Sequence, residues 1–371
     1  MARRGQNEGS IYQRADGRWA AAVSVGRGKR DTFYGKTRGE VQRKLTAALK
    51  NQDEGLPAST SKQRVADYLT AWLETVEGSG KIRPKTFSTY SMYVRLHIIP
   101  ELGRLALDEL GPQHVEQLMA KKLAEGLAAQ SVVHVRGILR RALGRAVKHQ
   151  LLIRNVAALA DPPHVARTEM RPLDPAQART FLELAQGDRL EALWVLAITS
   201  GLREGELLGL QWRDVDLEAG TVAVNRSLQR FGGKLQLVEP KTEKSRRRNP
   251  IPRMTVEALR SHRSRQVAAG RPPLPTGFVF TSTTGTPLEP RNMVRLFKSL
   301  LRRAGLPDVR FHDLRHSAAS LLIAQGVPLR TVMEVLGHST ITLTANTYGH
   351  LYEEAKRDAA DAMDRMLGAQ A

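Results

Sequence analysis

The chain of 371 residues contains no cysteine. A thiol nucleophile, a zinc–thiolate centre and disulfide bonds are therefore excluded, and the absence fits a reducing compartment. No apolar run approaches the length needed to cross a bilayer. The N-terminus is basic but no apolar segment follows it, so no signal peptide is visible. The sequence also lacks a P-loop motif, which argues against ATP as an energy source.

Acidic residues are in the minority throughout. Lys and Arg number 57 against 37 Asp and Glu, which gives a formal net charge of +20. Residues 1–57 carry 12 basic and 6 acidic side chains, residues 58–165 carry 15 and 9, and residues 166–371 carry 30 and 22. Charge spread in this way predicts that all three parts face a long polyanion, most simply DNA or RNA. A generally basic soluble protein is the alternative.

Two stretches rich in turn-forming residues, 51–63 and 155–172, divide the chain into three blocks. Hydrophobic residues make up 41% of the composition, enough for each block to form a core. We expect a mainly α protein with small β-sheets, of the α+β class. The predicted domains are a three-stranded sheet plus helix at 1–57, a helical bundle at 62–160, and a mixed α/β domain at 168–371.

The first block shows the alternation and turns of a small sheet. Strands are expected at residues 9–14, 19–25 and 29–34. A helix follows, with Thr37 and Glu40 as its capping pair. The basic residues at the last turn and strand are Arg27, Lys29 and Arg30. A basic three-stranded sheet can enter a DNA major groove, although an ordinary basic surface would look the same.

The second block is helical, with apolar periodicity at residues 65–76, 85–98, 111–125 and 129–149. The last of these helices pairs an apolar stripe with a basic face, and residues 131–154 contain no acid. Its candidate DNA contacts are Arg136, Arg140, Arg141 and Arg145. A solvated face usually mixes both signs of charge, so the one-sided pattern favours phosphate contact.

The third block is expected to have strands at residues 221–228, 234–238 and 247–251, with helices elsewhere. It also contains a spaced set of phosphate-directed groups: Arg203, Lys241, His312, Arg315, His338 and Tyr348. Cations can hold the non-bridging oxygens of a phosphodiester while a tyrosine attacks phosphorus and a proton donor serves the leaving hydroxyl. Glu206 lies three residues after Arg203 and is a candidate supporting residue, close enough to orient it.

His312 and His316 have the spacing of metal ligands on a helix, but no third ligand or general-base glutamate accompanies them. We therefore predict no metal site. His312 and Arg315 lie three apart and share one helix face, where one can manage a proton and the other can clamp an oxygen.

Taken in order, these motifs resemble the tyrosine recombinases, the phage-integrase family. The matching segments are Gly201-Leu-Arg-Glu-Gly-Glu206, Pro240-Lys-Thr, His312-Asp-Leu-Arg-His316, Leu336-Gly-His-Ser339 and Thr347-Tyr-Gly-His-Leu351. The resemblance covers nearly the whole chain. It implies a catalytic third block, a core-binding second block with a SAM-like fold and an arm-binding first block.

The resemblance assigns roles to the set. Tyr348 would be the nucleophile that forms a 3′-phosphotyrosyl link, and Arg203 with Arg315 would stabilise charge on the phosphate. His312 would be the base and Lys241 the acid. His338 would hydrogen-bond the scissile phosphate.

The family further implies a site-specific recombinase that integrates or excises a mobile element without a cofactor, as a homotetramer on double-stranded DNA with core and arm sites. A host bending protein and an excision factor are open as accessory partners. A cytoplasmic, nucleoid-associated location in a bacterial host is expected.

Several alternatives stay open at this stage. The chain could be a transposon recombinase, a chromosome-dimer resolvase, a type IB topoisomerase or a catalytically silent DNA-binding regulator. Lys244 competes with Lys241 as the acid, and Tyr352 is the alternative nucleophile. The C-terminal helix expected from Glu353 could dock in cis or on a neighbouring protomer.

Overall fold

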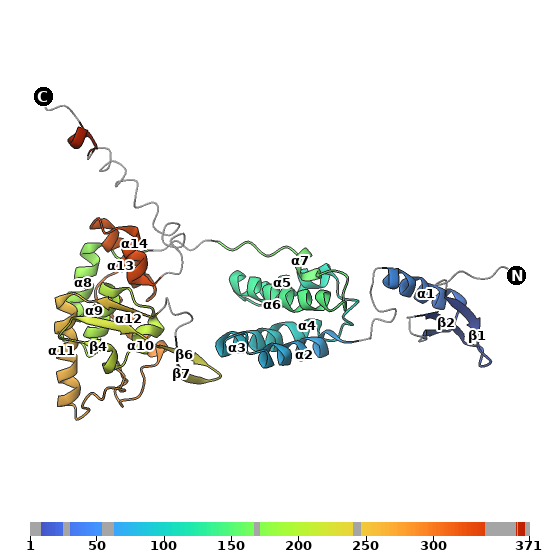
Figure 1. The fold of residues 1–371 in the computed structure, drawn as a ribbon, viewed down its shortest axis with the longest axis horizontal. Helices are drawn as coiled ribbons and strands as arrows, with labels where there is room; N and C mark the ends of the chain where they lie inside the picture. Colours follow the sequence, from blue (N-terminus) through green and yellow to red (C-terminus); the bar gives the residue numbers. More distant parts are fainter. Residues whose placement is uncertain are drawn as a thin grey trace. The chain divides into compact units, whose positions relative to one another are not determined.

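The computed structural model describes residues 9–24, 30–53, 63–166, 171–239, 246–337, 361 and 363–367. The chain divides into two compact units, residues 1–167 and 168–371, which Figure 1 shows in blue to green and in green to red. Helices dominate and the sheets are small and antiparallel, so the predicted α+β class is confirmed. In the described residues, no helix combines the length and apolarity that a membrane crossing requires.

The first unit begins with a small sheet covered by one helix. Its elements are β1 (Ser10–Gln13), β2 (Trp19–Ser24), β3 (Arg30–Gly35) and α1 (Arg38–Asp53), and the strand order is β1-β2-β3. Ala21 and Val23 of β2 pack against Val41 and Leu45 of α1. The alternation expected for β2 is correct for Ala21 and Val23, but the neighbouring Ala20 and Ala22 are buried as well.

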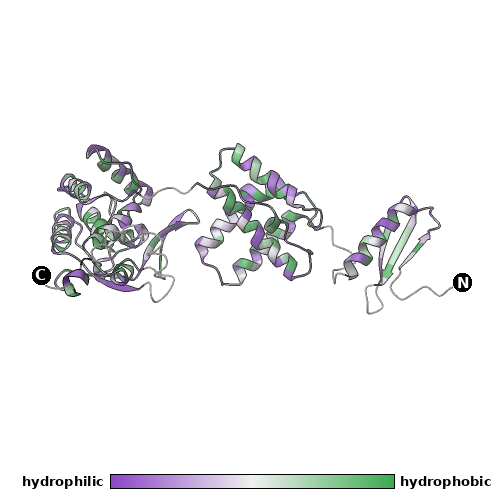
Figure 2. Ribbon diagram, turned by 90° about the horizontal axis from the view of Figure 1, so that it is seen from above, coloured by the Kyte–Doolittle hydropathy of each residue, from purple (hydrophilic) through white to green (hydrophobic). Residues whose placement is uncertain are grey.

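The rest of the first unit is a helical bundle with its own core. Its elements are α2 (Val65–Gly78), α3 (Pro84–Tyr93), the π-helix η1 (Val94–Ile98), α4 (Ile99–Leu102), α5 (Pro112–Ala124), α6 (Ala129–Lys148) and α7 (Val156–Leu159). Hydrophobic and hydrophilic residues alternate around these helices (Figure 2), as expected when one stripe of each helix is buried. The Tyr68 hydroxyl donates to the Ala142 carbonyl at 2.6 Å and so joins α2 to α6 inside the core.

Most elements of the second unit are helices. They are α8 (Pro175–Ala185), α9 (Glu191–Ser200), α10 (Glu204–Leu208), the 3-10 helix η2 (Trp212–Asp214), α11 (Arg253–Ala268), α12 (Pro290–Arg303), α13 (Asp313–Ala324) and α14 (Leu329–Leu336). The central helix is α9, which is buried on almost every face and packs against α11 and α13. The helix that ends at Gly201 is therefore a core element.

The strands of the second unit form two separate sheets. They are β4 (Val215–Asp216), β5 (Thr221–Val224), β6 (Ser227–Phe231), β7 (Lys234–Val238) and β8 (Arg247–Pro250). The first sheet has the order β4-β5-β8, and β6 with β7 makes a hairpin. That hairpin projects from the body of the unit (Figure 1).

The structure corrects the single strand predicted at residues 221–228. The chain leaves one sheet after β5 and enters the hairpin at β6. Asn225 and Arg226 make this break, because both side chains bond to the buried Asp214 carboxylate, at 2.9 Å and 3.0 Å. The β propensity of the segment gave no sign that two polar residues would be drawn inward.

Four aromatic rings form the centre of the second unit's core. Phe297 lies edge-on to Phe181 and Phe311, with ring centroids 5.7 and 5.4 Å apart, and Trp194 packs beside it at 6.0 Å. Phe297 is fully buried. Edge-to-face geometry adds to the hydrophobic contribution of these rings. The cluster joins α8, α9 and α12 to the segment that leads into α13.

Replacing Phe297 by alanine should therefore destabilise the second unit by about 3–5 kcal/mol. Urea unfolding of the full chain, followed by tryptophan fluorescence, measures the change. Leu296→Ala is the matched control, because this neighbouring side chain is 41% exposed and should change stability by less than about 0.5 kcal/mol. Equal losses in the two variants would contradict this account of the core.

Candidate active site

Arg203 begins α10 at a sharp turn of the chain. Gly201 ends α9 in the left-handed conformation, with φ of 59°, and a side chain there would meet Leu336 of α14. The turn brings Arg203 out of the core with its side chain 40% exposed. Its guanidinium donates to Glu206 Oε1 at 2.8 Å and to the Gly337 carbonyl at 2.9 Å. Arg203 is thus fixed at two points while part of it remains accessible to a ligand.

Arg315 of α13 comes to the same turn from the far end of the unit's sequence. It is buried, and its Nη1 donates to the Gly201 carbonyl at 2.6 Å, two residues before Arg203. His312 immediately precedes α13 and is exposed at the surface. The structure therefore brings three of the predicted site residues to one place, although more than 100 residues separate Arg203 from the other two.

The charges at this place act on His312. Partial removal of water from around the ring lowers the pKa of His312, and the nearby guanidiniums of Arg315 and Arg203 lower it further, with Asp313 opposing them. A lowered pKa leaves the imidazole neutral at pH 7, in the form that can accept a proton. Burial first, and the neighbouring cations second, thus give His312 the property that a general base needs.

Glu206 is buried between two guanidinium groups. Its Oε1 accepts from Arg203, and its Oε2 accepts from the Arg203 backbone N–H at 3.0 Å and from Arg247 Nη2 at 2.9 Å. Burial alone would raise the pKa of Glu206, but the hydrogen bond and charge of Arg247, together with Arg203, hold it below its usual range. Glu206 is therefore an anion that fixes the position of Arg203.

Arg247 is a part of this site that the sequence interpretation missed. It lies on β8 with only 8% of its side chain exposed. The sequence shows three consecutive arginines, 246–248, and nothing in that run distinguishes the buried one. The alternation of β8 was the available signal, since Arg247 and Asn249 point inward and Arg248 points outward.

His316 lies beside His312, with the two rings nearly perpendicular and their centroids 5.2 Å apart. Burial lowers the pKa of His316 to about 4, and the charge of His312 contributes in the same direction. Across the described ranges, no group of three or more His, Cys, Asp or Glu side chains is arranged to hold a metal ion. His316 is therefore a neutral, half-buried neighbour of His312.

Three of the six predicted catalytic residues, Lys241, His338 and Tyr348, lie outside the described residues, as do Lys244 and Tyr352. The described residues stop at Glu239 and resume at Arg246, on either side of Lys241. Arg246 pairs with Glu239 at 2.8 Å. It also reaches Gly337, whose carbonyl bonds to Arg203. The residue before His338 is therefore part of the site.

The predicted DNA-contacting residues of the second block gather on α6. A hollow of about 730 Å³ on this helix is lined by six cationic or imidazole side chains and no acid. The lining residues are Lys81, Gly137, Arg140, Arg141, Gly144, Arg145, Lys148, His149 and Asn155. Arg141 is held over the Tyr90 ring at 5.6 Å. An added side chain at Gly137 would meet nothing within 4 Å, so a ligand can approach the helix backbone closely there.

Arg136 differs from the other three arginines of α6. Its Nε donates to the Ala160 carbonyl at 2.6 Å and its Nη2 reaches the Ala158 carbonyl at 3.4 Å. These bonds satisfy backbone groups at the end of α7 and give Arg136 a structural role.

Of the basic residues predicted in the first block, Arg30 begins β3 and is exposed, whereas Arg27 and Lys29 lie outside the described residues.

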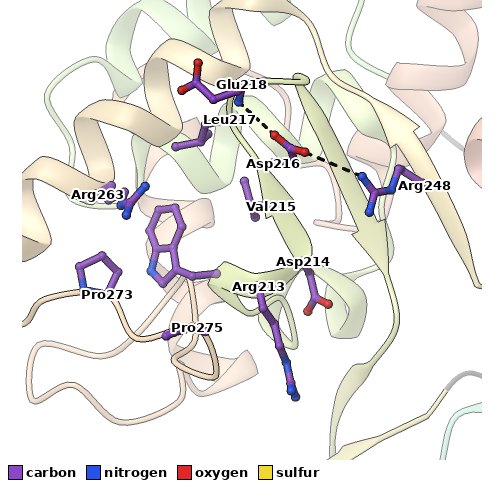
Figure 3. Close-up of a pocket in the computed structure, with 11 residues that line it drawn as sticks. Arg213, Asp214, Val215, Asp216, Leu217, Glu218, Arg248, Arg263, Pro273 and Pro275 are labelled. Atoms are coloured by element: carbon purple, nitrogen blue, oxygen red, sulfur yellow. Dashed lines mark hydrogen bonds and ion pairs between the residues drawn. The ribbon is translucent and has the colours of Figure 1, made fainter.

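A second cleft, of about 410 Å³, lies beside β4 and α11 (Figure 3). Three arginines and three acids are among its lining residues, and Asp216 faces Arg248 at 4.0 Å. Arg263 lies over the Trp212 ring at 5.9 Å. Because both signs of charge line it, this cleft is not suited to a polyanion, in contrast to the hollow on α6.

Comparison with known proteins agrees with this geometry. Residues 171–355 match the phage integrase family, and residues 65–123 match the N-terminal SAM-like domain of phage integrases. A tyrosine recombinase XerC-like protein of Caldanaerobacter subterraneus subsp. tengcongensis is 32% identical over 94% of this chain and 96% of its own length.

Two solved structures share the fold. The integrase of transposon Tn1549, bound to transposon right-end DNA, has a TM-score of 0.68 and 24% identity over 81% of this chain and 99% of its own. The lambda integrase tetramer bound to a Holliday junction has a TM-score of 0.56 and 19% identity over 90% of this chain and 96% of its own.

Fold and site together define an enzyme of the class that cleaves and rejoins DNA. The chain belongs to the phage integrase family of tyrosine recombinases.

The pKa of His316 predicts an acid-sensitive second unit. An unfolded histidine takes up a proton near pH 6.5, whereas folded His316 resists protonation until about pH 4. Stability should therefore fall as pH is lowered from about 6.5. Thermal unfolding of the wild type and His316→Gln between pH 5 and 8 measures this effect. The wild type should lose more stability than the variant on acidification, and parallel curves would contradict the prediction.

Proposed function

We propose that this protein is a site-specific DNA recombinase that integrates and excises a mobile element through a 3′-phosphotyrosyl intermediate. The observation that supports it best is the convergence of Arg203, Arg315 and a neutral His312 at one turn, which Glu206 holds in place. Two fixed cations and a proton acceptor are the groups that phosphoryl transfer without a divalent metal requires.

In the proposed reaction the Tyr348 hydroxyl attacks phosphorus. A phenol, whose ordinary pKa is about 10, is mostly protonated at pH 7, so it needs a base to become a nucleophile. His312 accepts the proton. The phosphorus–5′-oxygen bond breaks, and Lys241, or Lys244 as the alternative, protonates the leaving oxygen. His338 hydrogen-bonds the scissile phosphate.

Arg203 and Arg315 stabilise the charge that develops on the non-bridging oxygens. Loss of either should raise the barrier by roughly 3 kcal/mol, by analogy with other preorganised donors. The covalent ester conserves the bond energy, so rejoining to a second strand needs no ATP. This is the chemistry of type IB topoisomerases, applied to the exchange of strands between two DNA sites.

The proposed domains divide the work of holding DNA. Residues 62–160 bind the core site through α6, residues 1–57 bind an arm site through the sheet that carries Arg30, and residues 168–371 perform catalysis. The lambda integrase tetramer on a Holliday junction supports a homotetramer as the active assembly. The DNA-bound Tn1549 integrase supports double-stranded DNA as the partner.

Covalent capture tests the nucleophile. A nicked suicide duplex that carries the junction bordering the element's genomic copy should trap a protein–DNA adduct with the wild type. Tyr348→Phe should form none, because it lacks the attacking oxygen, and Tyr352→Phe should react like the wild type. An adduct that survives Tyr348→Phe but not Tyr352→Phe would move the nucleophile. Relaxation of plasmids without any site requirement would instead indicate a topoisomerase.

Salt dependence tests the hollow on α6. Each phosphate neutralised contributes about 0.9 to the slope of log K against log salt concentration. Arg140→Gln should therefore reduce the slope for duplex DNA by about 1. Arg136→Gln is the matched control on the same helix: it should lower thermal stability, because two carbonyls lose their donor, and leave the slope unchanged. Equal changes of slope would show that the two residues do not differ in role.

A further inference from the structure

Arg247 lies behind the candidate site, on the side away from solvent. Its Nη2 donates to Glu206 Oε2 at 2.9 Å and its Nε donates to the Val335 carbonyl at 3.1 Å. With 8% of its side chain exposed, it has no surface to offer a DNA phosphate. The guanidinium instead spans two parts of the protein: the carboxylate that holds Arg203, and the last turn of α14.

The end of α14 is a second point where these contacts meet. The Val335 carbonyl also accepts from Asn249 Nδ2 at 2.7 Å, so two inward side chains of β8 bind one helix terminus. Gly337 then adopts a left-handed conformation, with φ of 68°. A side chain at Gly337 would come within 2.7 Å of Arg247 Nη1. The guanidinium of Arg247 therefore lies directly against the backbone of Gly337.

Arg203 contacts Glu206 and the end of α14 from the solvent-accessible side. It bonds to Glu206 and to the Gly337 carbonyl, whereas Arg247 bonds to Glu206 and to the Val335 carbonyl. The two arginines thus contact the same carboxylate and the same helix end, one exposed and one buried. Planar guanidiniums suit such bridging, because their donors are fixed in one geometry.

Removing Arg247 would change what Glu206 and α14 do. Glu206 would keep Arg203 as its remaining partner among these two arginines, and the Val335 carbonyl would lose one donor. A buried carboxylate that loses one of its two cations keeps a charge that burial penalises, so Glu206 would no longer hold Arg203 in one defined position. The end of α14 would also lose one of its attachments.

We propose that Arg247 is a positioning residue for strand transfer: it holds Glu206 and the end of α14 in place, so that Arg203 meets the scissile phosphate in a fixed direction. This inference rests on the proposed recombinase function. A merely structural Arg247 would contribute to folding but leave the rate of cleavage by folded protein unchanged.

The test uses the full chain and the nicked suicide duplex described above, with adduct formation and DNA binding measured separately. Arg247→Met should slow single-turnover adduct formation at least tenfold and change the dissociation constant for the duplex less than twofold. Arg248→Met is the matched control, because this neighbour on β8 is 63% exposed and faces Asp216; it should react at the wild-type rate. Arg247→Lys keeps the charge beside Glu206, protects folding, and should give an intermediate rate, because an ammonium is not a planar fork.

The pH profile provides a readout that loss of stability would not move. The charged groups that act on Glu206 are Arg247 and Arg203. Without Arg247, less positive charge opposes the effect of burial on the pKa of Glu206. That pKa therefore rises, and Glu206 takes up a proton at higher pH. The rate of Arg247→Met relative to wild type should therefore fall further as pH is lowered from 8 to 6.5, a range above the pH at which His316 begins to affect stability. Adding Glu206→Gln should remove this extra pH dependence.

Wild-type adduct formation, measured first, separates the two hypotheses. If the wild type forms no adduct, the proposed function fails and this inference fails with it. If the wild type reacts and both Arg247 variants form the adduct as fast as the wild type does, the proposed function stands and the positioning role is wrong. A loss of DNA affinity as large as the loss of rate would also overturn it, since that result would make Arg247 a binding residue.

Discussion

Glu206 is a buried carboxylate between two guanidinium groups, and the geometry of the candidate site depends on that pairing. Burial penalises its charge, and the hydrogen bonds and positive charges of Arg247 and Arg203 hold its pKa below the usual range. The same two arginines bind carbonyls at the end of α14. Glu206 and the two arginines together join α10, β8 and α14, and the position of Arg203 depends on a buried pairing that is costly to break.

The two described cationic surfaces follow different designs. At the candidate site, Arg203 and Arg315 are fixed by a carboxylate and by backbone carbonyls, so their directions are set before a phosphate arrives. On α6 the arginines line an open hollow that contains no acid. Fixed cations suit a transition state, where position determines rate. An open basic surface suits a DNA backbone, where summed charge determines affinity.

Much of the fold could be predicted from the sequence because the segments are strongly patterned. The helices expected at residues 129–149 and 65–76 agree with α6 and α2 to within a residue or two. The strand predicted at residues 221–228 was wrong because Asn225 and Arg226 are drawn toward Asp214, a tertiary contact that local propensity does not carry. The π-helix η1 inside the second predicted helix of the bundle was likewise not foreseen.

For the site, the sequence by itself determined which chemical groups are available: its motifs singled out Arg203, Glu206, His312 and Arg315, and with them the family. Only the tertiary structure decided how these groups are held. Arg247 and its neighbour Arg248 are identical in type, yet one is buried against Glu206 and the other is exposed. The pleat of β8 and the packing of α14 determine which of the two arginines is buried. A guanidinium is tolerated inside the protein only where a carboxylate and carbonyls accept its hydrogen bonds.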